Sequence, residues 1–286
     1  MGIGKIFGKI LEYSSMKQYD FYIVPTPIGN LGDMTERAIE TLKNVDIIAC
    51  EDIRVTQKLL NHFGIKTKCV SYHKFNEKER VNYFLELLRS GKKTALVSDA
   101  GTPLFCDPGA VIVKELRKNG FTVTALPGAN AVATFLSQIA RDGEDFAFAG
   151  FLPKKRRQIE KILDNYRHTD LVFYDSPNRI LNTLEIIKEC RENSFVGVAR
   201  ELTKVFEEVI VDKCENVIEH FKNSVVKGEF AVLVFRSSEN REITDLQEKI
   251  STLKSKNFKA KEIAVILSSL YNINKNDIYK KIQTLT

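Results

Sequence analysis

The chain has 286 residues, of which 43% are hydrophobic, and this is enough for two domains of ordinary size with buried cores. No apolar run approaches the length of a membrane span, so we expect a soluble protein, and its net charge of +6 is too mild to identify a partner. The five cysteines are scattered and never form a Cys-x-x-Cys pair, which argues against structural zinc and indicates a reducing cytoplasm.

The first 19 residues precede the first convincing strand. Residues 2–8 lack the third glycine of a dinucleotide-binding loop because Phe7 stands in its place. Gly8 and Lys9 are followed by Ile10, so the segment is not a phosphate loop either, and it lacks the pattern of a secretion signal. We expect residues 1–19 to form a flexible or weakly helical extension.

Apolar runs alternate with stretches of helical periodicity from residue 20 to residue 238. The stretch at 81–88 is helical in spacing and is followed by Gly91, a typical helix end. This alternation predicts an α/β fold with two domains, 20–127 and 128–238, and a ligand cleft between them. The predicted strands are 21–24, 45–50, 94–98, 121–126, 146–151, 171–174, 195–199 and 230–235, with helices in the second domain at 159–166 and 179–192.

A lysine-rich, helical tail follows at residues 239–286. Helices are predicted at 243–253 and 260–270, with a third from about Asn274. An apolar stripe within it contains Ile263, Ile266, Leu267 and Leu270. The tail is either a cap that packs on the main body or a small helix-turn-helix-like module that touches RNA.

Three loops rich in glycine and proline each follow an apolar run, at residues 25–32, 98–109 and 127–130. Glycine allows the backbone to approach a ligand closely, and proline stiffens the loop. Loops of this kind at the ends of strands are typical of nucleotide pockets in α/β proteins. They predict an enzyme that binds a nucleoside-bearing cofactor.

Six motifs occur in order along the chain, and together they carry a family resemblance. They read VPTPIGNLGDMTERAIETLKNVDIIACEDIRVTQKLL, SDAGTPLFCDPG, LPGANA, AGFLP, ARELTKVFEE and GEFAVLV. This succession resembles the ribosomal RNA small subunit methyltransferase I family of the tetrapyrrole methylase superfamily, over roughly residues 20–236. The resemblance implies two α/β domains that hold S-adenosylmethionine in the cleft between them. It also implies 2′-O-methylation of a cytidine in 16S ribosomal RNA by a cytoplasmic homodimer.

The resemblance also assigns residues that would bind the methyl donor. They are Pro27 and Ile28 in the first loop, Asp99, Gly101, Thr102 and Phe105 in the second, Asn130 and Ala131 in the third, and Asp175, Glu229 and Phe230 in the second domain. Cys106 stands where related sequences commonly carry serine. A small residue is retained there, so we expect donor binding to survive.

Methylation of a ribose hydroxyl benefits from a group that attracts its proton. Two clusters at strand ends offer such groups. The first contains Glu51, Asp52 and Arg54, and the second contains Arg200, Glu201 and Lys204. For the first cluster the alternative is a helix cap with its ion pair, and for the second a plain surface pair. Glu201 is our first choice for the base, with Lys204 favouring its ionisation or holding phosphate.

Contacts to RNA are predicted at two places. Four consecutive basic residues, Lys154, Lys155, Arg156 and Arg157, suit phosphate contacts, or are a solvated helix start. Asn76 and Glu77 are assigned to substrate binding. Related sequences tend to have His, Asn and Glu close together at this point, whereas Lys74 and Phe75 separate His73 from Asn76 in this chain. A lone histidine is more often structural than catalytic. Tyr72, Phe75 or Tyr174 could stack on an unstacked base, or belong to the core.

Two other functions share these features. One is a methyltransferase of the same fold that acts on a tetrapyrrole or a protein side chain, and the other is a non-catalytic RNA-binding relative. A small substrate requires neither the basic run at 154–157 nor the helical tail, which argues against the first. The complete donor loops argue against the second.

Overall fold

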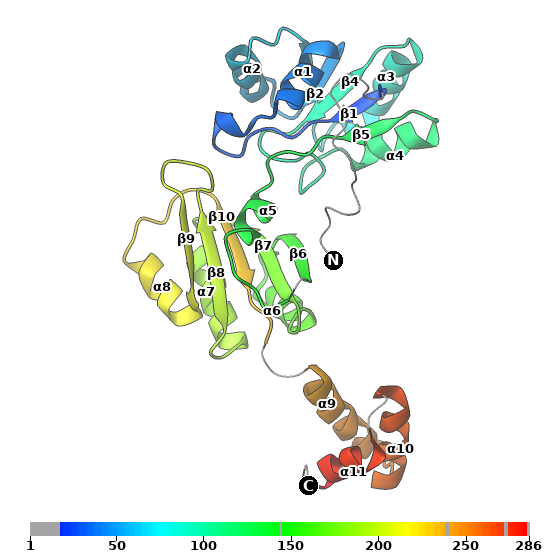
Figure 1. Ribbon diagram of the computed structural model, residues 1–286, viewed down its shortest axis with the longest axis vertical. Coiled ribbons are helices and arrows are strands. Elements are labelled where there is room, and N and C mark those ends of the chain that lie inside the picture. Colours follow the sequence, from blue (N-terminus) through cyan, green and yellow to red (C-terminus); the bar gives the residue numbers. More distant parts are fainter. Residues whose placement is uncertain (1–17, 144, 238–240, 272–273, 285–286) are drawn as a thin grey trace, which may run out of the picture.

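The computed structural model describes residues 18–143, 145–237, 241–271 and 274–284. Two α/β domains follow each other along the long axis of the molecule, and a unit of three helices lies beyond them (Figure 1). The predicted fold class is confirmed. Almost all of the predicted N-terminal extension lies outside the described residues.

The first domain is built on a five-stranded parallel sheet of order β3-β2-β4-β1-β5. Its central strands are continuous apolar runs because helices cover both faces. Helices α1 and α2 pack on one face with Leu42 and Leu60, and α3 and α4 pack on the other with Phe84 and Leu116. The strands are β1 (Phe21–Ile23), β2 (Ile47–Cys50), β3 (Lys68–Ser71), β4 (Thr94–Val97) and β5 (Val123–Ala125), and the helices are α1 (Glu36–Asn44), α2 (Ile53–His62), α3 (Glu77–Arg89) and α4 (Ala110–Lys118).

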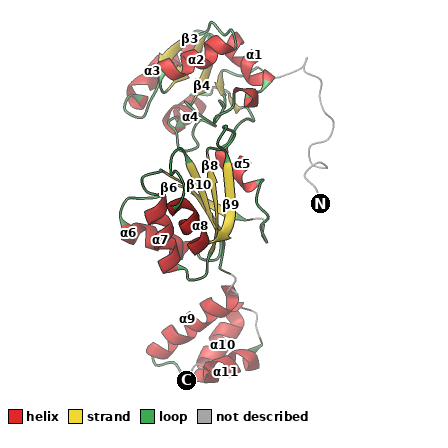
Figure 2. Cartoon of the chain, turned by 90° about the vertical axis from the view of Figure 1, so that its left-hand side faces the viewer, coloured by secondary structure: helices red, strands yellow, loops and turns green. Residues whose placement is uncertain are grey.

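The structure differs from the sequence expectation at strand boundaries and at one edge. The second strand begins at Ile47 and not at residue 45, because Val45 caps α1 with a hydrogen bond to Thr41. Strand β3 was not predicted, since it is a short edge strand whose residues are at most half-buried. All five strands are parallel, so the loops that follow them leave the sheet at one edge, where they face the second domain (Figures 1 and 2).

The second domain contains a mixed sheet of order β6-β7-β10-β8-β9, in which only β6 and β7 are parallel. Helices α6, α7 and α8 cover one face, and the short helix α5 packs on the other through Phe135 (Figure 2). Edge strand β9 is half-buried and was not predicted either. The elements are α5 (Ala131–Leu136), β6 (Phe146–Phe151), α6 (Arg156–Asn165), β7 (Asp170–Asp175), α7 (Ile180–Cys190), β8 (Phe195–Arg200), β9 (Glu208–Lys213), α8 (Cys214–Lys222) and β10 (Phe230–Val234).

The tail forms three helices, α9 (Arg241–Ser255), α10 (Ala260–Tyr271) and α11 (Lys275–Thr284). They enclose a core of their own, to which Ile263 and Leu267 contribute. Leu270 was predicted in the same stripe but is 68% exposed and does not belong to this core. The expected turn at 272–274 lies mostly outside the described residues. None of the described helices is long and apolar enough to cross a membrane.

Candidate active site between the two sheets

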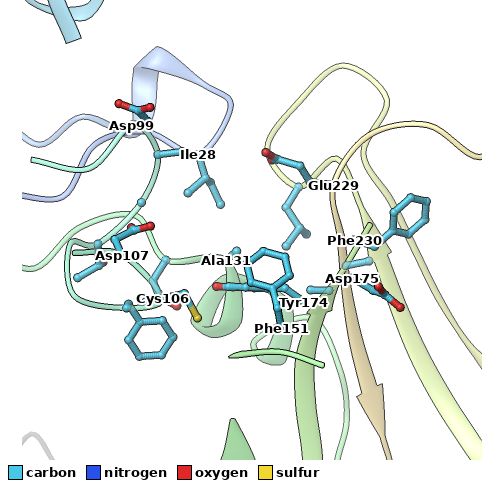
Figure 3. Close-up of a pocket in the computed structure, with 18 residues that line it drawn as sticks. Ile28, Asp99, Cys106, Asp107, Ala131, Phe151, Tyr174, Asp175, Glu229 and Phe230 are labelled. Carbon is cyan, nitrogen blue, oxygen red and sulfur yellow. The ribbon is translucent and has the colours of Figure 1, made fainter. Parts of the chain in front are cut away.

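A pocket of about 280 Å³ lies between the two α/β domains (Figure 3). Ten of the eleven residues that the resemblance assigns to the methyl donor line it, and they come from both domains. Its lining is Ile28, Asp99, Ala100, Gly101, Thr102, Phe105, Cys106, Asp107, Asn130, Ala131, Phe151, Tyr174, Asp175, Ala199, Leu202, Glu229, Phe230 and Ala231. The interdomain position therefore brings together loops that are more than 100 residues apart in the chain.

The first and second loops are joined directly by hydrogen bonds. Thr26 and Gly101 exchange two backbone hydrogen bonds of 2.9 Å, and the Thr26 hydroxyl donates to the Ser98 carbonyl at 3.0 Å. Gly101 has φ +82°, and a Cβ there would lie 3.2 Å from Cγ2 of Ile28. The left-handed φ favours glycine at this position, a side chain there would also crowd Ile28, and the Gly101 backbone forms part of the pocket wall.

The third loop is held by two side chains. The Asn130 carboxamide oxygen accepts hydrogen bonds from the Val132 and Ala133 amides, which caps α5. The Thr102 hydroxyl donates to the Ala129 carbonyl at 2.9 Å and so ties the second loop to the third. Ile28 of the first domain packs against the core of the second domain. The three loops thus form one connected framework around the pocket.

The lining is acidic, with four carboxylates and, among the described residues, no Lys, Arg or His. Burial, together with the charge of Glu51, raises the pKa of Asp107 to about 6. Burial also raises the pKa of Asp99 and, together with the charge of Asp99, that of Glu51. The carboxylates of Asp99 and Asp107, which line the pocket, and of Glu51, which does not, thus lie near one another. This concentration of negative charge favours a cationic ligand.

The pair Glu201 and Lys204 lies beside the pocket but does not line it. The Lys204 ammonium is 2.8 Å from Oε1 of Glu201 and 3.1 Å from Oε2 of Glu229, and the Glu229 amide donates to the same Glu201 oxygen at 2.9 Å. Burial opposes the ionisation of Glu201, but the bonds from Lys204 and Glu229 outweigh it, so its pKa is below the ordinary value. The pair holds Glu229 at the rim of the pocket.

Asp52 and Arg54 have the geometry of a helix cap. Asp52 caps α2 through the Arg54 amide, and the two side chains form an exposed ion pair of 2.7 Å. The hydrogen bonds from Arg54 lower the pKa of Asp52 to about 2. Neither side chain lines the pocket, although the Asp52 amide donates to Oδ1 of Asp99 at 3.1 Å and so positions that residue.

Three further predicted residues lie off the main pocket. Pro27 lines a second cavity of about 380 Å³, which Asp99 also lines. Asn76 accepts a hydrogen bond from the His73 amide at 2.8 Å, and Glu77 accepts one from the Gly109 amide at 2.8 Å. Both side chains thus hold loops, and Glu77 fixes the end of the loop that carries Asp107.

The basic run is only partly available for RNA. Lys154, Lys155 and Arg157 are exposed and have no ion-pair partner among the described residues. The Arg156 guanidinium instead pairs with Glu160 at 2.7 Å and with Glu189. The phosphate-binding prediction is thus weakest at Arg156.

The three aromatic residues expected to stack on a base have different positions. Tyr72 is fully buried in the first domain, so that prediction is wrong and the core alternative is right. Phe75 is 93% exposed but does not line the pocket, whereas Tyr174 does. Sequence analysis did not single out Asp107 or Phe151, both of which line the pocket; each lies within a quoted motif, which was the available signal.

The fold and the pocket define a class of protein, that of the tetrapyrrole methylases. The chain matches the tetrapyrrole (corrin/porphyrin) methylase family over residues 20–218. Solved structures share the fold: a diphthine synthase superposes with TM-score 0.58 at 14% identity, over 76% of this chain and 89% of its own. A cobalt precorrin-4 methyltransferase superposes with TM-score 0.56 at 15% identity, over 75% and 94%.

Sequence relatives narrow the class further. The chain is 39% identical to the ribosomal RNA small subunit methyltransferase I of Halalkalibacterium halodurans, over 90% of this chain and 92% of the relative. It is 43% identical to that of Bacillus subtilis, over 82% and 81%, and 39% identical to that of Haemophilus influenzae, over 91% and 94%. The chain belongs to the ribosomal RNA small subunit methyltransferase I family.

Proposed function

We propose that this protein transfers a methyl group from S-adenosylmethionine to the ribose 2′-hydroxyl of a cytidine in 16S ribosomal RNA. The observation that carries this proposal is the acidic interdomain pocket, in a chain of this family, lined by ten of the eleven residues expected at the donor. The family resemblance also predicts a homodimer in the cytoplasm, and light scattering of the purified protein tests the dimer.

The pocket suits the donor in charge and in shape. When bound, the donor supplies a methyl group on a positively charged sulfur, which is already a good electrophile. Asp99, Asp175 and Glu229 complement the positive charges of the sulfonium and ammonium groups. Ile28, Leu202 and Phe230 offer apolar surface to an adenosine. The buried Oδ2 of Asp175 has no hydrogen-bond partner among the described residues, so it can accept a hydrogen bond from a ligand, while Oδ1 lies 3.6 Å from the Arg179 guanidinium.

The hydroxyl that is methylated loses a proton, and a carboxylate is the natural acceptor in this site. Asp107 and Glu201 are the two candidates for the base. Asp107 lines the pocket, whereas Oε1 of Glu201 already accepts two hydrogen bonds and its pKa is lowered. The geometry favours Asp107 as the base and gives Glu201 and Lys204 the task of holding the rim.

The decisive experiment is transfer of labelled methyl from S-adenosylmethionine to 30S subunits taken from cells that lack the activity. Nuclease digestion then locates the label. Label in a 2′-O-methylcytidine supports donor, substrate and reaction together. Label in an added porphyrin, or none despite donor binding in calorimetry, would contradict the proposed substrate.

A further inference from the structure

One wall of the pocket is a continuous cluster of aromatic rings. Phe105 stacks on Phe148 with centroids 4.8 Å apart and an interplanar angle of 13°. Tyr174 contacts Phe148 at 5.1 Å and Phe151 at 5.5 Å. Phe105, Phe151 and Tyr174 line the pocket, and Figure 3 shows the last two side by side.

Phe151 differs from the other rings in its exposure. It is the last residue of β6 and is 63% exposed, although Leu152 beside it is buried. A large apolar ring left in water next to a pocket has given up the stabilisation that burial would bring. This arrangement is typical of a ring that a ligand covers.

A bulge in β6 brings Phe151 to this wall. Phe148 pairs with Val172 and Phe151 with Tyr174, so three steps along β6 match two steps along β7. Without the extra residue, Phe148 and Phe151 would point to opposite faces of the sheet, because side chains alternate along a strand. Gly150, with φ +64°, provides the left-handed conformation inside the bulge. The local backbone therefore aims Phe151 at the pocket.

A cluster of positively charged residues begins three positions after Phe151 in the chain. Lys154 lies three residues further on, within about 10 Å of backbone. Lys155 and Arg157 are exposed as well. The segment between is fixed, because the Arg179 guanidinium donates to the carbonyls of Leu152 and Pro153, both at 2.9 Å. An exposed ring with adjacent cations is the usual construction for one unstacked nucleotide and its flanking phosphates.

We infer that Phe151 is the platform on which the base of the target nucleotide stacks, with Lys154, Lys155 and Arg157 holding the neighbouring phosphates of a single-stranded RNA segment. The inference rests on the proposed function and places its substrate at one wall of the site. Phosphates are repelled by the four carboxylates inside the pocket, so the RNA backbone follows the basic segment outside it. Only the base and its ribose reach the donor.

The test compares Phe151→Ala with the matched control Phe195→Ala. Phe195 is 48% exposed and begins β8, about 13 Å along the strand from the pocket residue Ala199. Methyl transfer to undermethylated 30S subunits gives kcat and KM, and calorimetry gives the donor Kd. We expect Phe151→Ala to lower kcat/KM for 30S subunits about 5- to 100-fold, with the donor Kd within twofold of wild type. Phe151→Trp should restore kcat/KM, and Phe195→Ala should behave as wild type.

Three results would overturn the inference. Equal transfer by Phe151→Ala and wild type would show that no base stacks there. A donor Kd weakened as much as transfer would assign Phe151 to the adenosine of the donor instead. Absence of label with the wild-type protein would overturn the proposed function as well, so the wild-type measurement separates the two failures.

Discussion

Gly29 and Lys204 are in contact across the two α/β domains, and only glycine permits that contact. A Cβ on Gly29 would lie 2.4 Å from Cγ of Lys204 and 3.0 Å from Oγ1 of Thr203. Lys204 also forms ion pairs with Glu201 and with the pocket residue Glu229. The first loop of one domain is therefore linked to an acidic residue of the pocket through a lysine of the other domain.

We expect Gly29→Ala to displace the loop that carries Lys204 and to weaken donor binding about tenfold, because the rim carboxylate then loses its support. Calorimetric titration with S-adenosylmethionine measures this. Gly32→Ala is the matched control in the same loop, since a Cβ there meets only the Asn30 side chain, at 3.2 Å. Equal donor affinity in the two variants would show that the contact is not needed for the pocket.

Asp107→Asn should retain donor binding but lose at least about a hundredfold in methyl transfer, because the amide cannot accept the proton. In the wild type, kcat/KM should fall below a pH of about 6, where Asp107 becomes protonated. Glu201→Gln should keep this acidic limb of the profile. If the limb disappeared in Glu201→Gln and persisted in Asp107→Asn, the base would be Glu201.

The raised pKa of Asp107 also predicts a change in stability. Its folded-state pKa, about 6, lies above the value of an unfolded chain, so the proton binds more tightly to the folded protein. The contribution of Asp107 to the free energy of unfolding is therefore fully present below a pH of about 4 and is lost as the pH rises through about 6. Asp107→Asn should therefore be more stable than wild type at pH 7.5, by about 1–2 kcal/mol after allowance for partial exposure, and equal to it near pH 4. Urea unfolding at both pH values measures this; a constant difference would contradict it.

Changing Lys154, Lys155 and Arg157 together to alanine should lower the salt dependence of 30S binding, with a slope smaller by about 2 to 3. Arg156→Ala is the internal control. Its guanidinium is already engaged by Glu160 and Glu189, so its loss should change the slope little. Binding measured at several salt concentrations gives the slopes, and an unchanged slope in the triple variant would make the run an ordinary surface.

Much of the site follows from motifs that are local in the sequence. Each glycine-rich loop stands directly after a strand of the parallel sheet, and parallel strands end at one edge, so the three loops had to meet. The edge strands β3 and β9 could not be found in this way. Lys68–Ser71 and Glu208–Lys213 are half-buried and carry polar residues, so their place in a sheet depends on a neighbouring strand.

The roles of single side chains were harder to predict from the sequence than the positions of the loops. Asp52 and Glu201 have the residue type and the position expected of a base, but their hydrogen bonds are already made within the protein. Tyr72 has the residue type of a stacking platform but is buried in the core. Phe151 faces the pocket because of a bulge, which shifts the alternation of side chains by one residue.

The sequence by itself determined the family, the α/β class and the loops of the pocket, because these depend on short motifs and on local periodicity. Only the tertiary structure decided which carboxylates face the cavity, which cations are free and which ring is exposed. Those properties depend on burial, on hydrogen bonds between distant segments and on the register of neighbouring strands, and no local pattern contains them.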